Sequence, residues 1–86
     1  MRGRYEIRIT RQARKDVETL PPKLKAKLRA ILLDVIAVSP RDGKKLMGDL
    51  AGSYSWRLTY KDRIVYSVDE DSRIVYVERA RTHYGD

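Results

Sequence analysis

The sequence YSWRLTYKDRIVYSVDEDSRIVYVER, residues 54–79, contains three consecutive candidate strands. Within residues 54–60, apolar and polar side chains alternate, which is the period of a strand with one apolar face and one polar face. Residues 63–68 and 73–79 are rich in β-branched and aromatic side chains, and the turn-forming residues 69–72 separate them. Successive strands with short connections favour antiparallel pairing, so this stretch predicts an antiparallel meander.

One strand and two helices are predicted upstream of the meander. Residues 5–9 alternate in the same way as a strand, and Thr10 can cap a helix over residues 11–20. A Pro-Pro pair ends that helix, and Pro22 suits the first turn of a second helix over residues 22–38. Two helices joined by so tight a turn form a hairpin. The second helix has an apolar stripe at helical spacing: Leu24, Leu28, Ile31, Leu32, Val35 and Ile36.

The order of predicted elements is β-α-α-β-β-β, which indicates an α+β fold. The helical hairpin is expected to pack on one face of a mainly antiparallel four-stranded sheet, and the polar residues 39–52 are expected to form one long loop. A chain of 86 residues builds one hydrophobic core, so residues 1–86 are predicted to form a single domain. The uncovered face of the sheet carries polar side chains and is the expected place for a site.

The charge balance points to a polyanionic partner. The chain has 19 Lys and Arg against 12 Asp and Glu, a net charge of +7, and ten of the basic residues lie within residues 1–30. Such a surplus favours nucleic acid or the ribosome as partner, because binding to phosphates releases counterions. Lys25, Lys27 and Arg29 are candidate RNA contacts on the second helix. The alternative is that they only solvate its outer face.

Several function classes are disfavoured by composition. The chain has no cysteine, which excludes disulfides, thiolate catalysis and cysteine-ligated zinc, and its single histidine argues against a histidine metal site. We therefore expect neither a metal nor a cofactor. No apolar run approaches the roughly 18 residues of a membrane span, and the first ten residues are charged rather than apolar. We expect a soluble cytoplasmic protein that does not bind membranes.

His83 is the default candidate for proton transfer, because histidine alone has an ordinary pKa near neutrality. A lone histidine in a small domain is more often structural. Here, however, Arg79 and Arg81 precede it and Tyr84 follows, offering cationic charge for a phosphate and a ring that can stack on an unpaired base. These four residues predict an RNA-contact cluster, although an ordinary basic tail would look similar.

Arg57 and Arg63 stand on either side of a predicted turn. They share a face of the sheet if residue 59 pairs with residue 63 across a loop of residues 60–62, whereas a two-residue loop would separate them. Two convergent guanidinium groups can hold a phosphate and stabilise the charge that it gains during cleavage. The alternative is ion pairing with neighbouring carboxylates: Asp62, Asp69 or Glu78. The strand aromatics are predicted to pack in the core and the sheet rather than to stack on bases: Trp56, Tyr60, Tyr66 and Tyr76.

Four segments in order, residues 50–52, 56–59, 62–68 and 81–84, resemble the RelE/ParE toxin superfamily, most closely its Txe/YoeB branch. The most specific element is the strand RIVYSV combined with a terminal HY. The resemblance extends over nearly the whole chain, because the helical hairpin and the late strands also suit a RelE-like fold.

The resemblance implies a toxin that enters the ribosomal A site and cuts messenger RNA without a metal. The 2′-hydroxyl of the RNA would act as nucleophile and leave a 2′,3′-cyclic phosphate. In the same family pattern His83 would protonate the leaving 5′-oxygen, and Arg63 would contact the scissile phosphate with help from Arg57. Tyr84 would orient the substrate or stack on it. Arg81 is a phosphate-binding candidate from its position alone.

One position departs from the closest branch, which has a glutamate in the loop before the second strand. The alignment places Lys44 or Lys45 there. A lysine can accept a proton if its surroundings lower its pKa, or it can hold phosphate while another group takes the proton. The remaining carboxylate candidates for that task are Glu18, Glu78 and Asp86.

Two other functions are compatible with the same fold. ParE-like members poison DNA gyrase and have no ribonuclease site, and a noncatalytic module would only bind nucleic acid. The RNase reading is favoured because Arg57, Arg63, His83 and Tyr84 would have no common purpose in a gyrase poison. A toxin of this kind implies a cognate antitoxin whose acidic segment wraps the basic surface. Toxin dimers and toxin–antitoxin hetero-oligomers are both compatible with it.

Overall fold

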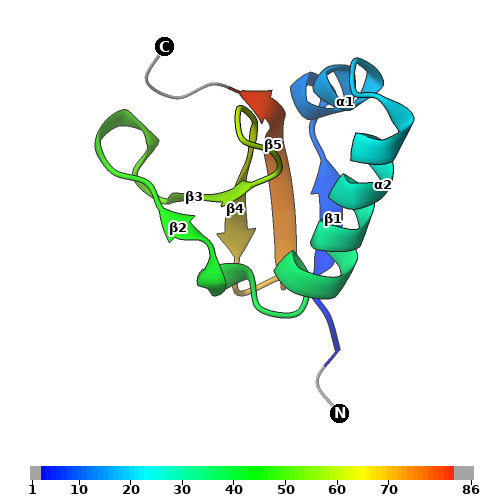
Figure 1. Ribbon diagram of the computed structural model, residues 1–86. Helices are drawn as coiled ribbons and strands as arrows, with labels where there is room; N and C mark the ends of the chain where they lie inside the picture. Colours follow the sequence, from blue (N-terminus) through cyan, green and yellow to red (C-terminus); the bar gives the residue numbers. More distant parts are fainter. Residues whose placement is uncertain (1–2, 83–86) are drawn as a thin grey trace.

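The structure, a computed structural model, describes residues 3–82 and has an α+β fold. A five-stranded sheet in the order β1-β5-β4-β3-β2 carries two helices, and only the β1–β5 pair is parallel (Figure 1). The regular elements are β1 (Glu6–Ile9), α1 (Arg11–Glu18), α2 (Pro22–Ile31), β2 (Lys44–Lys45), β3 (Ser53–Arg57), β4 (Arg63–Asp69) and β5 (Ile74–Thr82). A wider π-type turn, Leu32–Ile36, continues α2, and two short 3₁₀ turns follow at Pro40–Asp42 and Gly48–Leu50.

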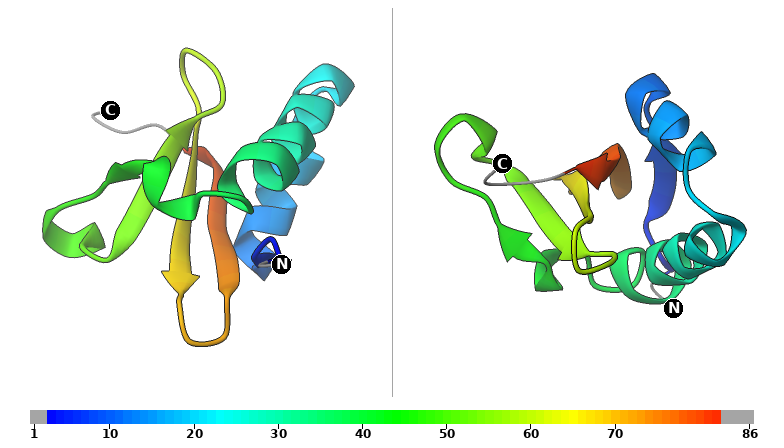
Figure 2. Two further views of the ribbon diagram at one scale, coloured as in Figure 1. Left: turned by 90° about the horizontal axis from the view of Figure 1, so that it is seen from below. Right: turned by 45° about the horizontal axis from the view of Figure 1, so that its top comes forward.

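The predicted helical hairpin on a mainly antiparallel sheet is confirmed, but the sheet has five strands instead of four. The additional strand β2 lies inside the segment that was expected to be a loop, and it pairs Lys44 with Ser55 and Lys45 with Tyr54. Two residues are too few to show an alternating pattern, so only the tertiary pairing reveals this strand. Both helices lie at the β1 end, whereas β3 and β2 bend away at the other end (Figure 2).

The start of α1 is fixed by the residue that the sequence predicts. The Thr10 hydroxyl oxygen accepts a hydrogen bond from the backbone N–H of Ala13 at 3.2 Å, which satisfies one of the free donors of the first turn. The helix ends at Glu18, slightly earlier than expected. The second helical run ends at Ile36 rather than at residue 38, and the backbone N–H of Ala37 closes its last turn on the carbonyl of Leu32.

Tyr66 is at the centre of the core. Its side chain is fully buried, its ring stacks on Tyr54 at 5.6 Å between centroids, and its hydroxyl donates to the backbone carbonyl of Pro40 at 2.6 Å. Burial raises the pKa of Tyr66 to about 12, so the hydroxyl stays protonated and keeps donating. The other fully buried large side chains come from the helices, the β3–β4 connection and the sheet: Ile36, Leu58, Ile64, Val75 and Val77.

The predicted strand over residues 54–60 ends at Arg57, because the chain then enters a turn. The packing prediction is consequently wrong for Tyr60, which is 91% exposed at the tip of that turn. It is confirmed for Tyr66, and Trp56 and Tyr76 are half-buried. Among the described residues, no helix has the length and apolar character that crossing a membrane requires.

Candidate functional site

Arg57 and Arg63 are direct cross-strand partners at the end of the β3–β4 pair. The register is neither of the two that the sequence left open, yet both arginines project from the same face, because cross-strand partners always do. The register differs because the connection is longer than expected. The backbone N–H groups of Leu58 and Thr59 both donate to the carbonyl oxygen of Asp62, at 2.9 and 3.1 Å, and close a wider turn.

Neither Arg57 nor Arg63 makes a side-chain hydrogen bond or ion pair within the part of the chain that the structure describes. The ion pairs there engage Arg8, Arg41, Arg79 and Arg81 instead. Like charges placed directly opposite each other in a sheet destabilise it when nothing neutralises them. This pair of guanidinium groups is therefore suited to an anion that lies across both.

The short strand β2 distinguishes the two lysines that the sequence left as alternatives. Lys44 pairs with Ser55 and therefore shares the face of Arg57 and Arg63, whereas Lys45 pairs with Tyr54 on the core side. Ser55 itself is only 2% exposed, and its hydroxyl has no hydrogen-bond partner among the described residues.

A carboxylate occupies the other end of the same open face. Glu78 accepts hydrogen bonds from the hydroxyls of Ser53 and Ser67, each at 3.1 Å. The sequence named Glu78 as one of three substitute proton acceptors and as a possible ion-pair partner of the arginines, and it did not single out either serine. The available signal was positional, because Ser53 and Ser55 alternate with the apolar residues of β3 and must lie on the polar face.

Arg79 and Arg81, both predicted to bind RNA, are attached to α1. Arg79 donates to the two carboxylate oxygens of Asp16 at 2.7 and 3.3 Å, and Arg81 donates to the carbonyl and hydroxyl oxygens of Thr19 at 2.9 and 3.0 Å. Burial opposes ionisation of Asp16, but the hydrogen bonds from Arg79 and from the N–H of Ala80 outweigh it and lower the pKa of Asp16. Both arginines thus have structural contacts, and RNA binding by them stays a prediction.

Sequence reasoning missed Asp16, although a signal for it was present. Asp16 follows Ala13 by three residues and therefore falls on the buried face of α1, where a carboxylate requires a partner.

The predicted proton donor His83 and its neighbour Tyr84 lie outside the described residues, so their placement is not part of the site as described. The last described residue of β5, Thr82, pairs with Arg63. The backbone that leads to His83 in the sequence is thereby held next to one of the two unpaired arginines.

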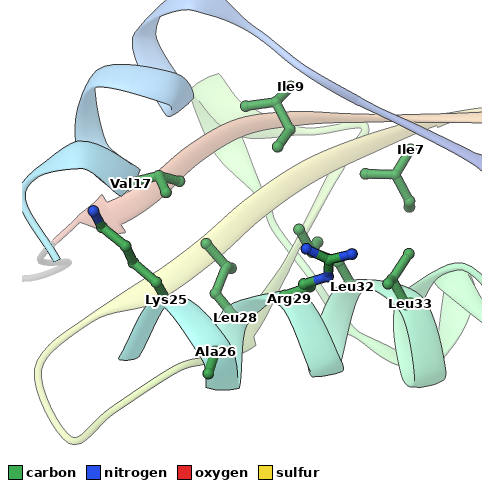
Figure 3. A pocket seen from close by; sticks show the side chains of 9 residues that line it. All are labelled: Ile7, Ile9, Val17, Lys25, Ala26, Leu28, Arg29, Leu32 and Leu33. Atoms are coloured by element: carbon green, nitrogen blue, oxygen red, sulfur yellow. The ribbon is translucent and has the colours of Figure 1, made fainter. Parts of the chain in front are cut away.

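A groove of about 650 Å³ lies between β1, α1 and α2, on the side of the molecule that carries the helices (Figure 3). Lys25 and Arg29 line it, but Lys27 does not. These cations are therefore separate from Arg57 and Arg63, which lie on the open face of the sheet. Most of the groove is apolar, formed by Ile7, Ile9, Val17, Leu28, Leu32 and Leu33.

Comparisons with known proteins identify relatives that share the sequence and the fold of this chain, although no family model matches it. The toxin RelG of Mycobacterium tuberculosis is 35% identical over 77 residues, which cover 87% of this chain and 86% of that protein. A chain of the toxin–antitoxin complex RelBE2 from Mycobacterium tuberculosis has 31% identity and a TM-score of 0.84, over 100% of this chain and 98% of that one. In the YoeB–YefM complex from Staphylococcus aureus, a chain matches with 26% identity and a TM-score of 0.77, over 94% and 99% of the two chains. A relative this similar over most of both lengths, together with the shared fold, shows that the chain belongs to the RelE/ParE toxin superfamily, which includes YoeB-like members.

Proposed function

We propose that this chain is the toxin of a type II toxin–antitoxin system and acts as a metal-independent, ribosome-dependent endoribonuclease on messenger RNA. The observation that carries the proposal is the directly opposed couple Arg57 and Arg63 on the open face of the sheet, which has no ion-pair partner within residues 3–82. A phosphodiester lying across both would neutralise their repulsion and receive hydrogen bonds from two guanidinium forks. The same groups would stabilise the extra negative charge that the phosphate gains during cleavage.

The reaction requires one proton acceptor and one proton donor around that phosphate. The 2′-hydroxyl attacks the adjacent phosphorus, the bond from phosphorus to the 5′-oxygen breaks, and a 2′,3′-cyclic phosphate and a 5′-hydroxyl end result. His83 would protonate the leaving 5′-oxygen, and Tyr84 would orient or stack on the substrate. Lys44, which shares the face of the arginines, is the lysine placed to hold phosphate or to accept the 2′-hydroxyl proton.

The test is to express the protein and map cut sites on ribosome-bound messages. Cuts within codons are expected, and His83→Ala should lower the cleavage rate by about 10²- to 10⁴-fold, the usual contribution of a general acid, while ribosome binding is kept. Arg57→Ala should also lower the rate, whereas Arg4→Ala removes an equal charge before β1, at the far edge of the sheet from β3, and should not. Intact message with gyrase trapped on DNA would favour the ParE-like function, and ribosome binding without cleavage would favour a noncatalytic module.

We also propose that the cognate antitoxin places an acidic segment with one apolar side in the groove between β1, α1 and α2. The groove is complementary to such a segment, because most of its lining is apolar and Lys25 and Arg29 add two positive charges to that lining. RelBE2 and YoeB–YefM, both similar in fold, are toxin–antitoxin complexes. Toxin dimers and hetero-oligomers with the antitoxin are compatible with this arrangement, and action on ribosomes would place the protein in the cytoplasm.

The groove proposal is tested with the cognate antitoxin, which we expect to be an acidic protein encoded by a reading frame next to this one. Leu33→Glu places a negative charge at the groove and should abolish its co-purification with the toxin, because a carboxylate would face an acidic, apolar segment. Val38→Glu is the matched control, since Val38 is similarly exposed but does not line the groove. Equal capture by both variants would place the antitoxin elsewhere.

A further inference from the structure

Glu78 is held in a fixed orientation on the open face. Ser53 on β3 donates to one of its carboxylate oxygens and Ser67 on β4 donates to the other, each at 3.1 Å. The two serines are cross-strand partners, so the carboxylate from β5 is attached to both neighbouring strands at once. Glu78 also lies at an irregularity in the β4–β5 pairing, and such bulges redirect side chains next to functional sites.

This carboxylate has no cationic partner among the residues that the structure describes. Within residues 3–82 Glu78 makes no ion pair, whereas Asp16 has Arg79. A carboxylate on a face that binds RNA repels phosphate, so RNA must present something else to it. An ionised carboxylate only accepts hydrogen bonds and has about four acceptor positions, of which the two serines use two. The free positions are therefore suited to N–H donors.

The position of Glu78 along the sheet excludes a direct role at the scissile phosphate. The Ser53–Ser67 pair lies four residues along β3 from the Arg57–Arg63 pair. At 3.2–3.4 Å per strand residue this separation is about 13 Å. Glu78 is thus too distant to share the phosphate that the arginines hold, but it lies on the same face and within reach of a neighbouring nucleotide. The N–H donors of that nucleotide belong to its base.

We propose that Glu78 reads a base beside the cut, accepts a hydrogen bond from an exocyclic amino group and discriminates against uracil. This inference rests on the proposed function. Adenine, guanine and cytosine each carry an exocyclic amino donor, whereas uracil has only its ring N–H, which lies between two carbonyl oxygens. A carboxylate placed to accept from an exocyclic amino group would face one of those oxygens in uracil, acceptor to acceptor, and would lose its hydrogen bond. A well-placed contact of this kind discriminates between bases by roughly 5- to 150-fold.

The experiment uses ribosomes programmed with messages that differ only in the base at each position flanking the cut. At one of these positions the wild-type protein should cut messages with adenine, cytosine or guanine at least about 5-fold faster than the message with uracil. Glu78→Gln presents both a donor and an acceptor at the same place and should cut the uracil message within about 2-fold of the others. Asp34→Asn, an exposed change in the turn that continues α2, should keep the wild-type preference.

Two further measurements separate base reading from a structural role. Replacing guanosine by inosine removes the amino group from the message, and it should slow the wild-type protein but not Glu78→Gln. Combining Ser53→Ala with Ser67→Ala frees the carboxylate, and it should reduce the preference between bases while cleavage of the favoured message continues. Thermal unfolding of each variant shows that it is folded.

Equal cutting of all four messages by the wild-type protein, or an unchanged preference in Glu78→Gln, would overturn this inference alone. Failure of the wild-type protein to cut any message would overturn the proposed function, and this inference with it.

Discussion

Asp16 joins α1 to β5 through a single carboxylate, which binds the guanidinium of Arg79 and the backbone N–H of Ala80. A buried carboxylate of this kind would be costly without those donors. The residue therefore fixes the position of the Arg79 guanidinium in the folded protein. Neighbourhood in the sequence suggested an RNA contact by Arg79 next to His83, which stays a prediction, but it could not show a carboxylate partner 63 residues away in the sequence.

We expect Asp16→Asn to lower the free energy of unfolding by about 2 kcal/mol at neutral pH, because hydrogen bonds to a charged group are lost. The pKa of Asp16 is lowered in the folded state, so its contribution is present above the unfolded-state pKa of about 3.9 and is lost as the pH falls through the folded-state value. Urea denaturation should show the difference between variant and wild type narrowing below about pH 4.

Asp34→Asn is the control, since Asp34 is exposed and should give no such dependence. An Asp16→Asn difference that stays constant down to strongly acidic pH would contradict the assigned ionisation.

At the scale of elements, features that depend on residues close together in the chain could be predicted from the sequence. Features that depend on pairing between distant residues could not. Alternation and capping gave the helical hairpin and the meander, because these depend on residues close together in the chain. Strand β2 and the β3–β4 register depend on which distant groups pair. From the sequence, a common face for Arg57 and Arg63 depends on the register, and the observed register, shifted by two residues from the pairing of 59 with 63, preserves the alternation. The wider turn of residues 58–62 could not be read in advance, since side-chain hydrogen bonds from Thr59 and Asp62 shape it.

Gly43 precedes β2 and fits against the centre of the core. A Cβ atom built there would meet the hydroxyl of Tyr66 and lie 3.0 Å from the carbonyl oxygen of Ser55. The backbone of Gly43 has φ −69°, which any residue adopts, so the cost of a side chain is one of space alone. Gly43→Ala should therefore destabilise the fold by about 1–3 kcal/mol, as overpacking does.

Chemical denaturation measures this effect, with Gly3→Ala as the matched control because nothing lies within 4 Å of a Cβ built at Gly3. Equal stability of the two variants would mean that the Tyr66 hydroxyl moves aside without cost.

At the scale of the whole molecule, the fold sorts the positive charge onto two surfaces. Composition indicated a polyanionic partner but could not show that Lys25 and Arg29 border the apolar groove while Arg57 and Arg63 lie on the open face. The basic residues behind the net charge of +7 therefore include two groups with separate proposed contacts. The groove pair would contact a docking partner, and the pair on the open face would contact the scissile phosphate. Spatial sorting of this kind depends on the packing of helices against the sheet, which no local pattern contains.

Reversing the charges of Lys25, Lys27 and Arg29 should weaken ribosome binding, because each removed phosphate contact lowers the slope of log affinity against log salt by about 1. Binding measured over a series of salt concentrations gives this slope. Reversal at Arg4, Arg11 and Arg14, three exposed residues outside α2, is the control for net charge. An unchanged slope in the triple variant would assign these residues to solvation of the helix.

Strand β5 lies between β1 and β4, so the last strand to be synthesised occupies an interior position of the sheet. Until its residues leave the ribosome, β1 has no partner, and Asp16 and Thr19 lack the arginines that hold α1. Contacts of such long sequence separation form late and slowly. The nascent chain therefore cannot pair β1 or fix α1 before the residues of β5 have left the ribosome, so the order of synthesis delays closure of the sheet.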